Sequence, residues 1–158
     1  MAIAPDGYRH RHAPLATIGV GLGDGTERAA TLALGRQLAA DERATLRALH
    51  VVQIATWVTP PNVFAGINYD AALREWEDRL GALEDVAGTV VLGTRVGELA
   101  KFADALDLLV LGSCERSRAG RVLFGSTAEA LAGRITVPLL VAPRSARDAS
   151  GAEAADAA

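Results

Sequence analysis

The sequence predicts an α/β fold in which a doubly wound, mostly parallel sheet of five strands carries helices on both faces. Two observations lead to this fold class. Strand patterns and helix patterns alternate along the chain, which is the order that βαβ units produce. The segments 108–111 and 137–142 are apolar throughout, as expected of strands that are buried on both faces of a parallel sheet.

Each expected element follows from its own pattern. Strand patterns cover residues 15–22, 45–52, 89–92, 108–111 and 137–142. Helix patterns cover residues 24–40, 70–86, 97–105 and a segment that starts near Ser126. Asp24 and Glu27 have the spacing of a capping-box variant at a helix start. Ser126 and Glu129 have the spacing of a full capping box.

The chain ends and the composition restrict the remaining possibilities. We expect residues 1–13 to form a flexible arm, residues 14–144 a single domain, and residues 145–158 a disordered tail. A net charge of −3 and a pI near 5.6 give no electrostatic case for nucleic acid. No apolar run has the length of a membrane span, and residues 1–11 lack the apolar core of a signal peptide. With one cysteine and no metal-ligand cluster, a cytoplasmic protein without a metal site is the simplest expectation.

Two glycine-containing turns make a place for a phosphate group. Gly112 ends the fourth strand pattern, and Gly125 precedes the last helix pattern. Glycine lets backbone N–H groups approach an anion, and a helix N-terminus supplies unpaired donors. Ligands of doubly wound sheets bind beyond the carboxyl ends of the strands, where the strand order reverses. If the first and fourth strands are neighbours, the turn Gly21–Asp24 therefore faces the same crevice as Gly112.

The order of these elements, together with several short motifs, resembles the universal stress protein family over roughly Leu15 to Pro143. Gly112 and Gly125-Ser126 have the separation of the first and last positions of the glycine motif in the family's nucleotide-binding members. Further stretches similar to family motifs are Asp107–Gly112, Asp24–Glu27, His50–Val52 and Val137–Val141.

The resemblance implies a Rossmann-like domain that binds an adenine nucleotide, ATP or AMP, with Mg²⁺ if the nucleotide is ATP. Such a protein would act as a regulatory or stress-response module. The residues implied to contact the nucleotide are Gly21, Leu22, Gly23, Asp24, Val51, Leu111, Gly112, Ser113, Gly125, Ser126 and Thr127. No catalytic base or arginine finger can be assigned, so hydrolysis is expected to be slow at most.

Three arginines, Arg116, Arg118 and Arg121, lie within the glycine motif. Guanidinium groups match phosphate oxygens, so these residues are candidates for phosphate pairing. The alternative is a solvated basic loop. Other candidates also have a structural alternative. Asp24 and Ser126 could be helix caps, Val51 and Leu111 core residues, and His50 a structural histidine, while Cys114 could be a redox sensor or a plain thiol.

Two departures from the family pattern favour a second function. Glu115 replaces the middle glycine of the motif, and Gly21-Leu22-Gly23 lengthens the turn before Asp24. A carboxylate in a phosphate loop opposes a polyanion. The alternative is therefore a nucleotide-free, dimeric protein-interaction module. In either case the resemblance implies a homodimer through the last strand, Val137–Ala142, which is expected at a sheet edge where unpaired backbone groups favour pairing with another chain. A further protein partner is unknown.

Overall fold

The computed structural model describes residues 2–5, 14–54, 68–113 and 126–142. Strands and helices alternate through these residues, as the sequence predicts. The elements in chain order are β1 (Ala2–Ile3), β2 (Thr17–Leu22), α1 (Glu27–Glu42), β3 (Thr45–Gln53), α2 (Tyr69–Gly81), β4 (Ala87–Gly93), α3 (Arg95–Ala103), β5 (Leu108–Gly112), α4 (Ser126–Ala132) and β6 (Leu139–Ala142).

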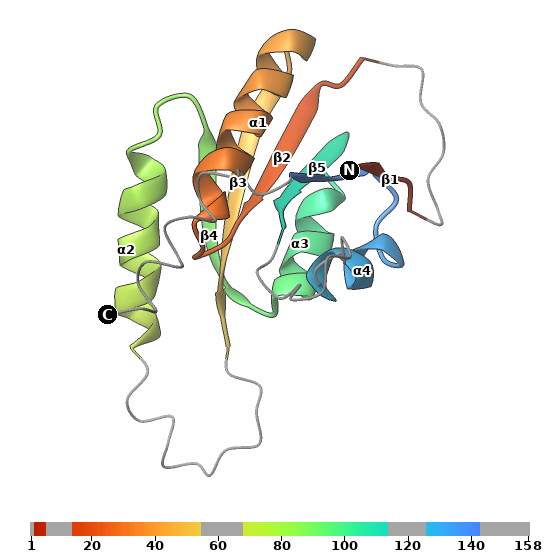
Figure 1. The fold of residues 1–158 in the computed structure, drawn as a ribbon. Helices are drawn as coiled ribbons and strands as arrows, with labels where there is room; N and C mark the ends of the chain where they lie inside the picture. The colour runs from red at the N-terminus through yellow and green to blue at the C-terminus, as the bar shows by residue number, and fades with distance from the viewer. Residues whose placement is uncertain (1, 6–13, 55–67, 114–125, 143–158) are drawn as a thin grey trace, which may run out of the picture.

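The strands form one sheet in the order β1-β6-β5-β2-β3-β4 (Figure 1). The pairs β2–β3, β2–β5, β3–β4 and β5–β6 are parallel, and β1–β6 is antiparallel. From β2 the chain builds outward to β4, then returns to the other side of β2 and builds outward again. The doubly wound, mostly parallel sheet is therefore confirmed, and the strand order reverses between the neighbours β2 and β5.

The sheet has six strands, so the expectation of five is wrong. The additional strand is β1, which falls within the segment expected to be an arm. Ala2 pairs with Leu140 and Ile3 with Leu139, and Ile3 also packs against the hydrophobic core. A strand of two residues has no readable periodicity, so only its long-range pairing identifies it. Since β1 lies beside β6, β6 is not the sheet edge that the sequence predicts.

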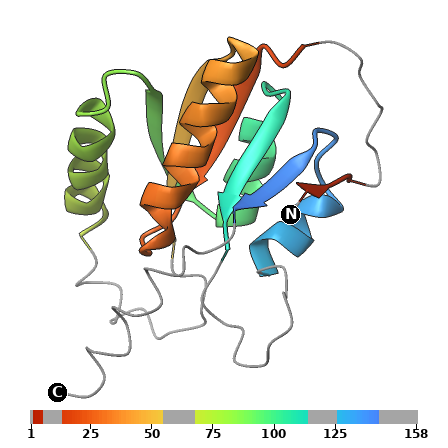
Figure 2. The same ribbon diagram turned by 45° about the horizontal axis from the view of Figure 1, so that its top comes forward.

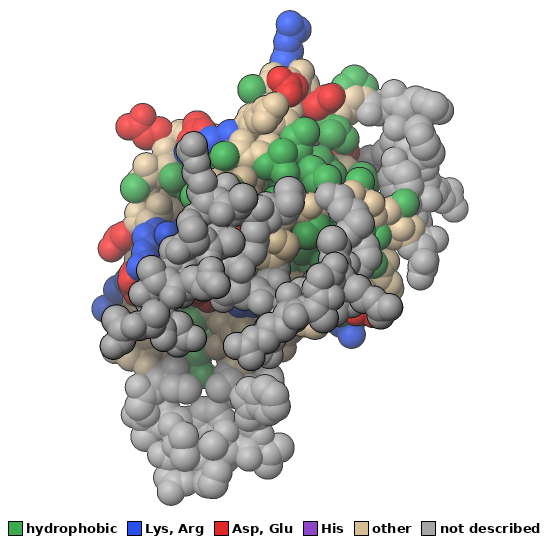
Figure 3. All heavy atoms as spheres, in the orientation of Figure 1, with side chains coloured by type: hydrophobic (Ala, Val, Ile, Leu, Met, Phe, Trp, Pro, Cys, Tyr) green, Lys and Arg blue, Asp and Glu red, His purple; other side chains and the backbone are tan. Residues whose placement is uncertain are grey.

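Helices cover both faces of the sheet, and a hydrophobic core lies on each side. Helices α1 and α2 pack on one face, and α3 and α4 pack on the other (Figure 2). Alternate residues of β3 serve the two cores. Ala48 belongs to the core beneath α1 and α2, whereas Leu49 and Val51 belong to the core beneath α3 and α4. On the first face, hydrophobic side chains also reach the surface beside α1, over β2 and β5 (Figure 3).

The residues at the helix starts differ in part from the sequence prediction. The N-cap of α1 is Thr26 rather than Asp24, and its side chain makes no capping hydrogen bond. Helix α2 begins after Asn68, whose Oδ1 accepts from the backbone N–H of Ala71 at 3.0 Å. Ser126, which the sequence predicts as an N-cap, is instead the first residue of helix α4. The spacing of Asp24 with Glu27 and of Ser126 with Glu129 in the sequence indicates candidate N-caps. It does not fix the residue at which the helix begins.

The amino-terminal ends of β2 and β5 are joined by Asp107. Its Oδ2 accepts hydrogen bonds from the backbone N–H groups of Ala16 and Thr17, at 3.0 and 2.9 Å. The N–H of Asp107 in turn donates to the Thr17 carbonyl at 2.8 Å. These bonds set the register of the two strands between which the strand order reverses. Among the residues described above, no helix is both long and apolar enough to cross a membrane.

Candidate functional site

A cavity opens at the carboxyl ends of β2, β3 and β5, where the strand order reverses. Its space, measured out to open solvent, is about 600 Å³. The lining residues are Gly21, Leu22, Gly23, Glu27, Leu49, Val51, Arg95, Leu99, Leu111, Gly112, Thr127 and Ala128.

One wall of the cavity is apolar. Leu49 and Val51 of β3, Leu99 of α3 and Leu111 of β5 are buried there in the core beneath α3 and α4. Such a surface stabilises a flat apolar group by removing it from water. It offers no acceptor or donor side chain, so polar recognition must come from the rest of the cavity.

Gly21 and Gly112 also line the cavity, and other side chains occupy the space that a Cβ atom would take at either position. A Cβ atom on Gly21 would lie 2.5 Å from the Leu111 Cδ2 and 2.8 Å from the Leu99 Cδ2. At Gly112, a Cβ atom would lie 2.4 Å from the Glu27 Cγ. Both contacts are too short for any side chain. A larger residue at either position would therefore have to displace the Leu111, Leu99 or Glu27 side chain.

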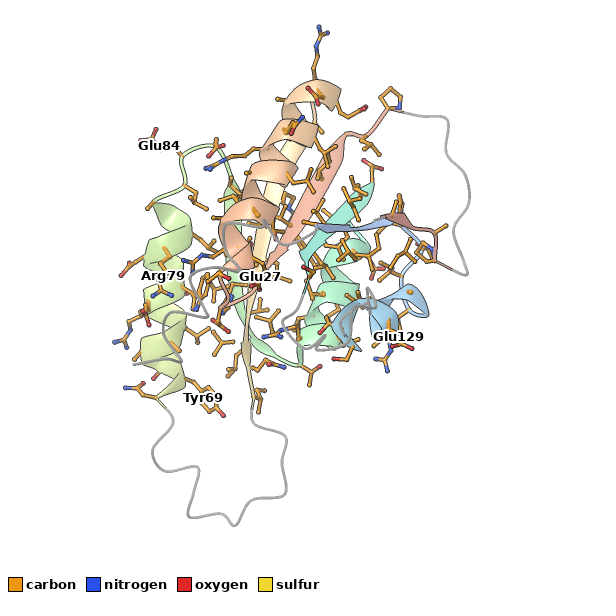
Figure 4. The ribbon with its side chains drawn as sticks, in the orientation of Figure 1. Glu27, Tyr69, Arg79, Glu84 and Glu129 are labelled. Atoms are coloured by element: carbon orange, nitrogen blue, oxygen red, sulfur yellow. The ribbon has the colours of Figure 1, made fainter. Side chains whose placement is uncertain are left out.

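Two charged side chains line the cavity. Glu27 is the first residue of α1, where the positive end of the helix dipole stabilises a carboxylate. Its side chain lies against Gly23 and Gly25 at the carboxyl edge of the sheet (Figure 4). Arg95 begins α3 and is half-buried. Within the described part of the chain, neither Glu27 nor Arg95 forms an ion pair, so both charges remain available to a ligand.

His50 lies on the other face of β3, behind the β2–α1 turn. Its Nδ1 donates to the carbonyl of Leu22 at 2.9 Å, and its Nε2 is 3.7 Å from the Asp24 Oδ1. The imidazole is stacked on Trp76, with ring centroids 3.5 Å apart and planes within 10°. Burial is the main cause that lowers the pKa of His50 from its ordinary value. At neutral pH the ring is therefore uncharged and its Nδ1 carries the proton.

The structure brings most of the sequence-predicted nucleotide contacts to this one cavity. Those that line it are Gly21, Leu22, Gly23, Val51, Leu111, Gly112 and Thr127. Asp24 does not line it, because its exposed side chain lies toward His50. Ser113 and Ser126 do not line it either. The Ser113 N–H donates to the Ala142 carbonyl at 3.1 Å, and Ser126 is exposed on α4.

The remaining sequence candidates lie outside the described residues. They are Gly125, the arginines Arg116, Arg118 and Arg121, the motif departure Glu115, and Cys114. Within the described ranges, no group of three His, Cys, Asp or Glu side chains could hold a metal ion.

Sequence reasoning missed five lining residues: Glu27, Leu49, Arg95, Leu99 and Ala128. A signal existed for Leu49, since it shares one face of β3 with Val51 at a spacing of two residues. A signal also existed for Arg95, which directly follows the carboxyl end of a parallel strand. The positions of Leu99 and Ala128 depend on how α3 and α4 pack together, which no local pattern predicts.

Comparison with known proteins agrees with the fold. A model of the universal stress protein family matches residues 15–143. The chain belongs to this family. The match lies inside the segment 14–144 that the sequence predicts as a domain. No match was found among the curated proteins with which the chain was compared.

Solved structures of universal stress proteins share the fold. The universal stress protein UspA from Lactobacillus plantarum is 19% identical, with a TM-score of 0.64 over 83% of this chain and 99% of that chain. The hypothetical protein MJ0577, solved for a structure-based assignment of its biochemical function, is 19% identical, with a TM-score of 0.67 over 84% and 99%. A universal stress protein in complex with cAMP is 27% identical, with a TM-score of 0.55 over 82% and 98%.

Proposed function

We propose that this universal stress protein binds an adenine nucleotide in the cavity and acts as a regulatory, stress-response module. The observation that carries the proposal is one cavity at the reversal of strand order that is lined both by an apolar wall and by glycines of the strand ends. A purine ring needs the first and a phosphate group the second. The candidates are ATP and AMP, with Mg²⁺ accompanying ATP, in a cytoplasmic protein.

The two sides of the cavity suit different parts of a nucleotide. The apolar side chains of Val51, Leu99 and Leu111 would hold the base. The part lined by Gly112 and Thr127 would receive the phosphates, because a hydroxyl and backbone N–H groups donate to anionic oxygens. Mg²⁺ would reduce the repulsion between the phosphates of ATP and the Glu27 carboxylate.

The relative in complex with cAMP supports an adenine nucleotide as the ligand class. The residues that line the cavity contain no serine, cysteine or histidine nucleophile and no histidine base. We therefore expect the nucleotide to act by shifting the stability and conformation of the protein, with hydrolysis slow at most.

The test is a titration of the full chain with Mg-ATP, AMP and cAMP, followed by melting temperature and calorimetry. A ligand that binds only the folded state adds about 2.7 kcal/mol of stability at a hundredfold excess over its Kd. Thr127→Trp places a bulky ring in the cavity and should abolish the shift. Thr136→Trp is the matched control, because Thr136 is exposed and does not line the cavity. No shift with any of the three nucleotides would overturn the proposal.

In that event the nucleotide-free, dimeric module would become the better hypothesis. A dimer through the last strand needs a β6 edge that is free to pair, and β1 already pairs with β6 in this chain. We therefore place it second, and its test is the oligomeric state described in the Discussion.

A further inference from the structure

We propose that His50 is a positioning residue for the nucleotide site, acting through the β2–α1 turn, residues 23–26, without touching the ligand. The inference rests on the function proposed above. His50 does not line the cavity, and its side chain is only 3% exposed. Two of its contacts, with the Leu22 carbonyl and with Asp24, nevertheless lie at the turn that forms one side of the cavity.

The first contact fixes the end of β2. Leu22 and His50 are partners in the parallel pairing of β2 and β3, and the His50 Nδ1 donates to the Leu22 carbonyl at 2.9 Å. Leu22 is buried and is the last residue of β2, so the imidazole holds its carbonyl at the point where the strand passes into the turn. Loss of the imidazole donor removes a buried side-chain hydrogen bond at the end of β2 and lets the first residues of the turn move.

The second contact fixes the ring that makes this hydrogen bond. Trp76 of α2 is 5% exposed and is stacked on the imidazole. Two guanidinium groups lie over the Trp76 ring, with the Arg28 Cζ 5.2 Å and the Arg79 Cζ 5.1 Å from its centroid. Arg28 belongs to the first turn of α1 and Arg79 to α2. The stack therefore joins both helices of this face to the imidazole, and the cation–π contacts stabilise it.

The consequence for the cavity follows from the chain path. Leu22 and Gly23 line the cavity directly, and the Glu27 side chain packs over Gly23 and Gly25. A displaced Leu22 carbonyl would move all three residues, because they are linked within one tight turn. The side chain of His50 thus sets the shape of one side of the cavity from the opposite face of the sheet.

Burial and the charged groups around His50 together keep the imidazole neutral at neutral pH. The nearby Asp24 raises the pKa of His50, whereas Arg95 of α3 and Arg28 of α1 lower it, and burial lowers it most. Arg79 faces the ring only through Trp76. The neutral ring with its proton on Nδ1 is the form that donates to Leu22.

The experiment compares two substitutions in the full chain, with AMP as the probe. His50→Asn keeps an amide donor near the position of Nδ1, and His50→Leu fills similar space without a donor. We expect His50→Leu to raise the Kd for AMP about tenfold, as a lost buried hydrogen bond transmitted to the site would. His50→Asn should restore most of the affinity. Leu80→Ala is the control. Leu80 is buried on α2, the helix that carries Trp76, but it packs against Gly88, away from the turn.

Each outcome separates the two proposals. If the unaltered protein fails to bind AMP, ATP and cAMP, the proposed function is overturned. If it binds AMP and His50→Leu binds equally well, the positioning role is overturned, as it is if Leu80→Ala weakens binding as much. Should His50→Leu not fold, His50→Gln replaces it, since its longer side chain does not place a donor at Nδ1. Faster hydrogen exchange of the amides of residues 23–26 in His50→Gln then supports the role, and unchanged exchange contradicts it.

Discussion

The side chain of Glu27 lies in the space that a side chain at Gly112 would occupy. A Cβ atom at residue 112 would lie 2.4 Å from the Glu27 Cγ and 2.7 Å from the Thr31 Oγ1. Thr31 is itself held in place, because its hydroxyl donates to the Glu27 carbonyl at 2.8 Å. The first turns of α1 therefore pack directly on the backbone at the end of β5.

Gly112→Ala should destabilise the protein and weaken nucleotide binding together. The added methyl group would force the Glu27 and Thr31 side chains from their positions, and such overpacking costs about 1–3 kcal/mol. Urea unfolding and an AMP titration measure the two effects. Gly133→Ala is the control, since a methyl group there meets no atom within 4 Å. Equal stability of the two variants would show that α1 can move away from β5 freely.

Asp107→Ala should lower stability without changing nucleotide affinity. The carboxylate accepts two backbone hydrogen bonds at the start of β2, at the opposite end of the strands from the cavity. Leaving these N–H groups without their acceptor costs about 1–3 kcal/mol. Asp104→Ala provides the comparison, as Asp104 is an exposed carboxylate at the end of α3. A clear loss of AMP affinity, measured well below the melting temperature, would contradict this purely structural role.

The buried His50 should make the stability of the protein depend on pH. Its pKa is lowered in the folded state, mainly by burial, relative to an ordinary value of about 6.5 in the unfolded state. Between these two values the unfolded chain binds more protons, so the free energy of unfolding rises with pH. This contribution is complete above about pH 7 and is lost as the pH falls below about 6.5.

Urea midpoints measured from about pH 8 to pH 5 test this sign, with His50→Asn as the comparison. The substitution should reduce the loss of stability on the acid side. Asp24→Asn should increase that loss, because the Asp24 charge raises the pKa of His50 and its removal lets the pKa fall further. Parallel pH profiles for all three proteins would mean that another group controls the acid sensitivity.

The edge of the sheet leads to a prediction about oligomeric state. We propose that β1 and a second copy of the chain compete for β6, because β1 lies antiparallel on the strand that the sequence predicts as the dimer interface. Removing residues 1–5 would uncover the backbone groups of β6, which favour pairing. Light scattering over a concentration series should then show dimers at lower concentration than for the full chain. The same dimer concentration range for the full chain and the shortened chain would contradict the proposed competition for β6.

The sequence predicts the architecture more completely than the cavity. Alternation of strand and helix patterns was sufficient for the doubly wound sheet. The sequence analysis left open whether the first and fourth strands are neighbours, and the pairing of β2 with β5 meets that condition. Asp24 failed as a cavity residue because the direction of an exposed side chain depends on a partner, here His50, from another strand. Leu99 was missed because its place depends on the docking of α3, which is a tertiary property.

The hydrogen bond between Thr17 and Asp107 joins residues 90 positions apart, and the cavity lies between the same two strands. During synthesis, the residues of β2 emerge long before those of β5, so a growing chain has no closed cavity until most of the domain has been made. Contacts over such separations are slow to form and cooperative. A ligand held there would stabilise the whole domain against unfolding and not one of its halves. Protein lifetime in the cell would then follow the supply of that ligand.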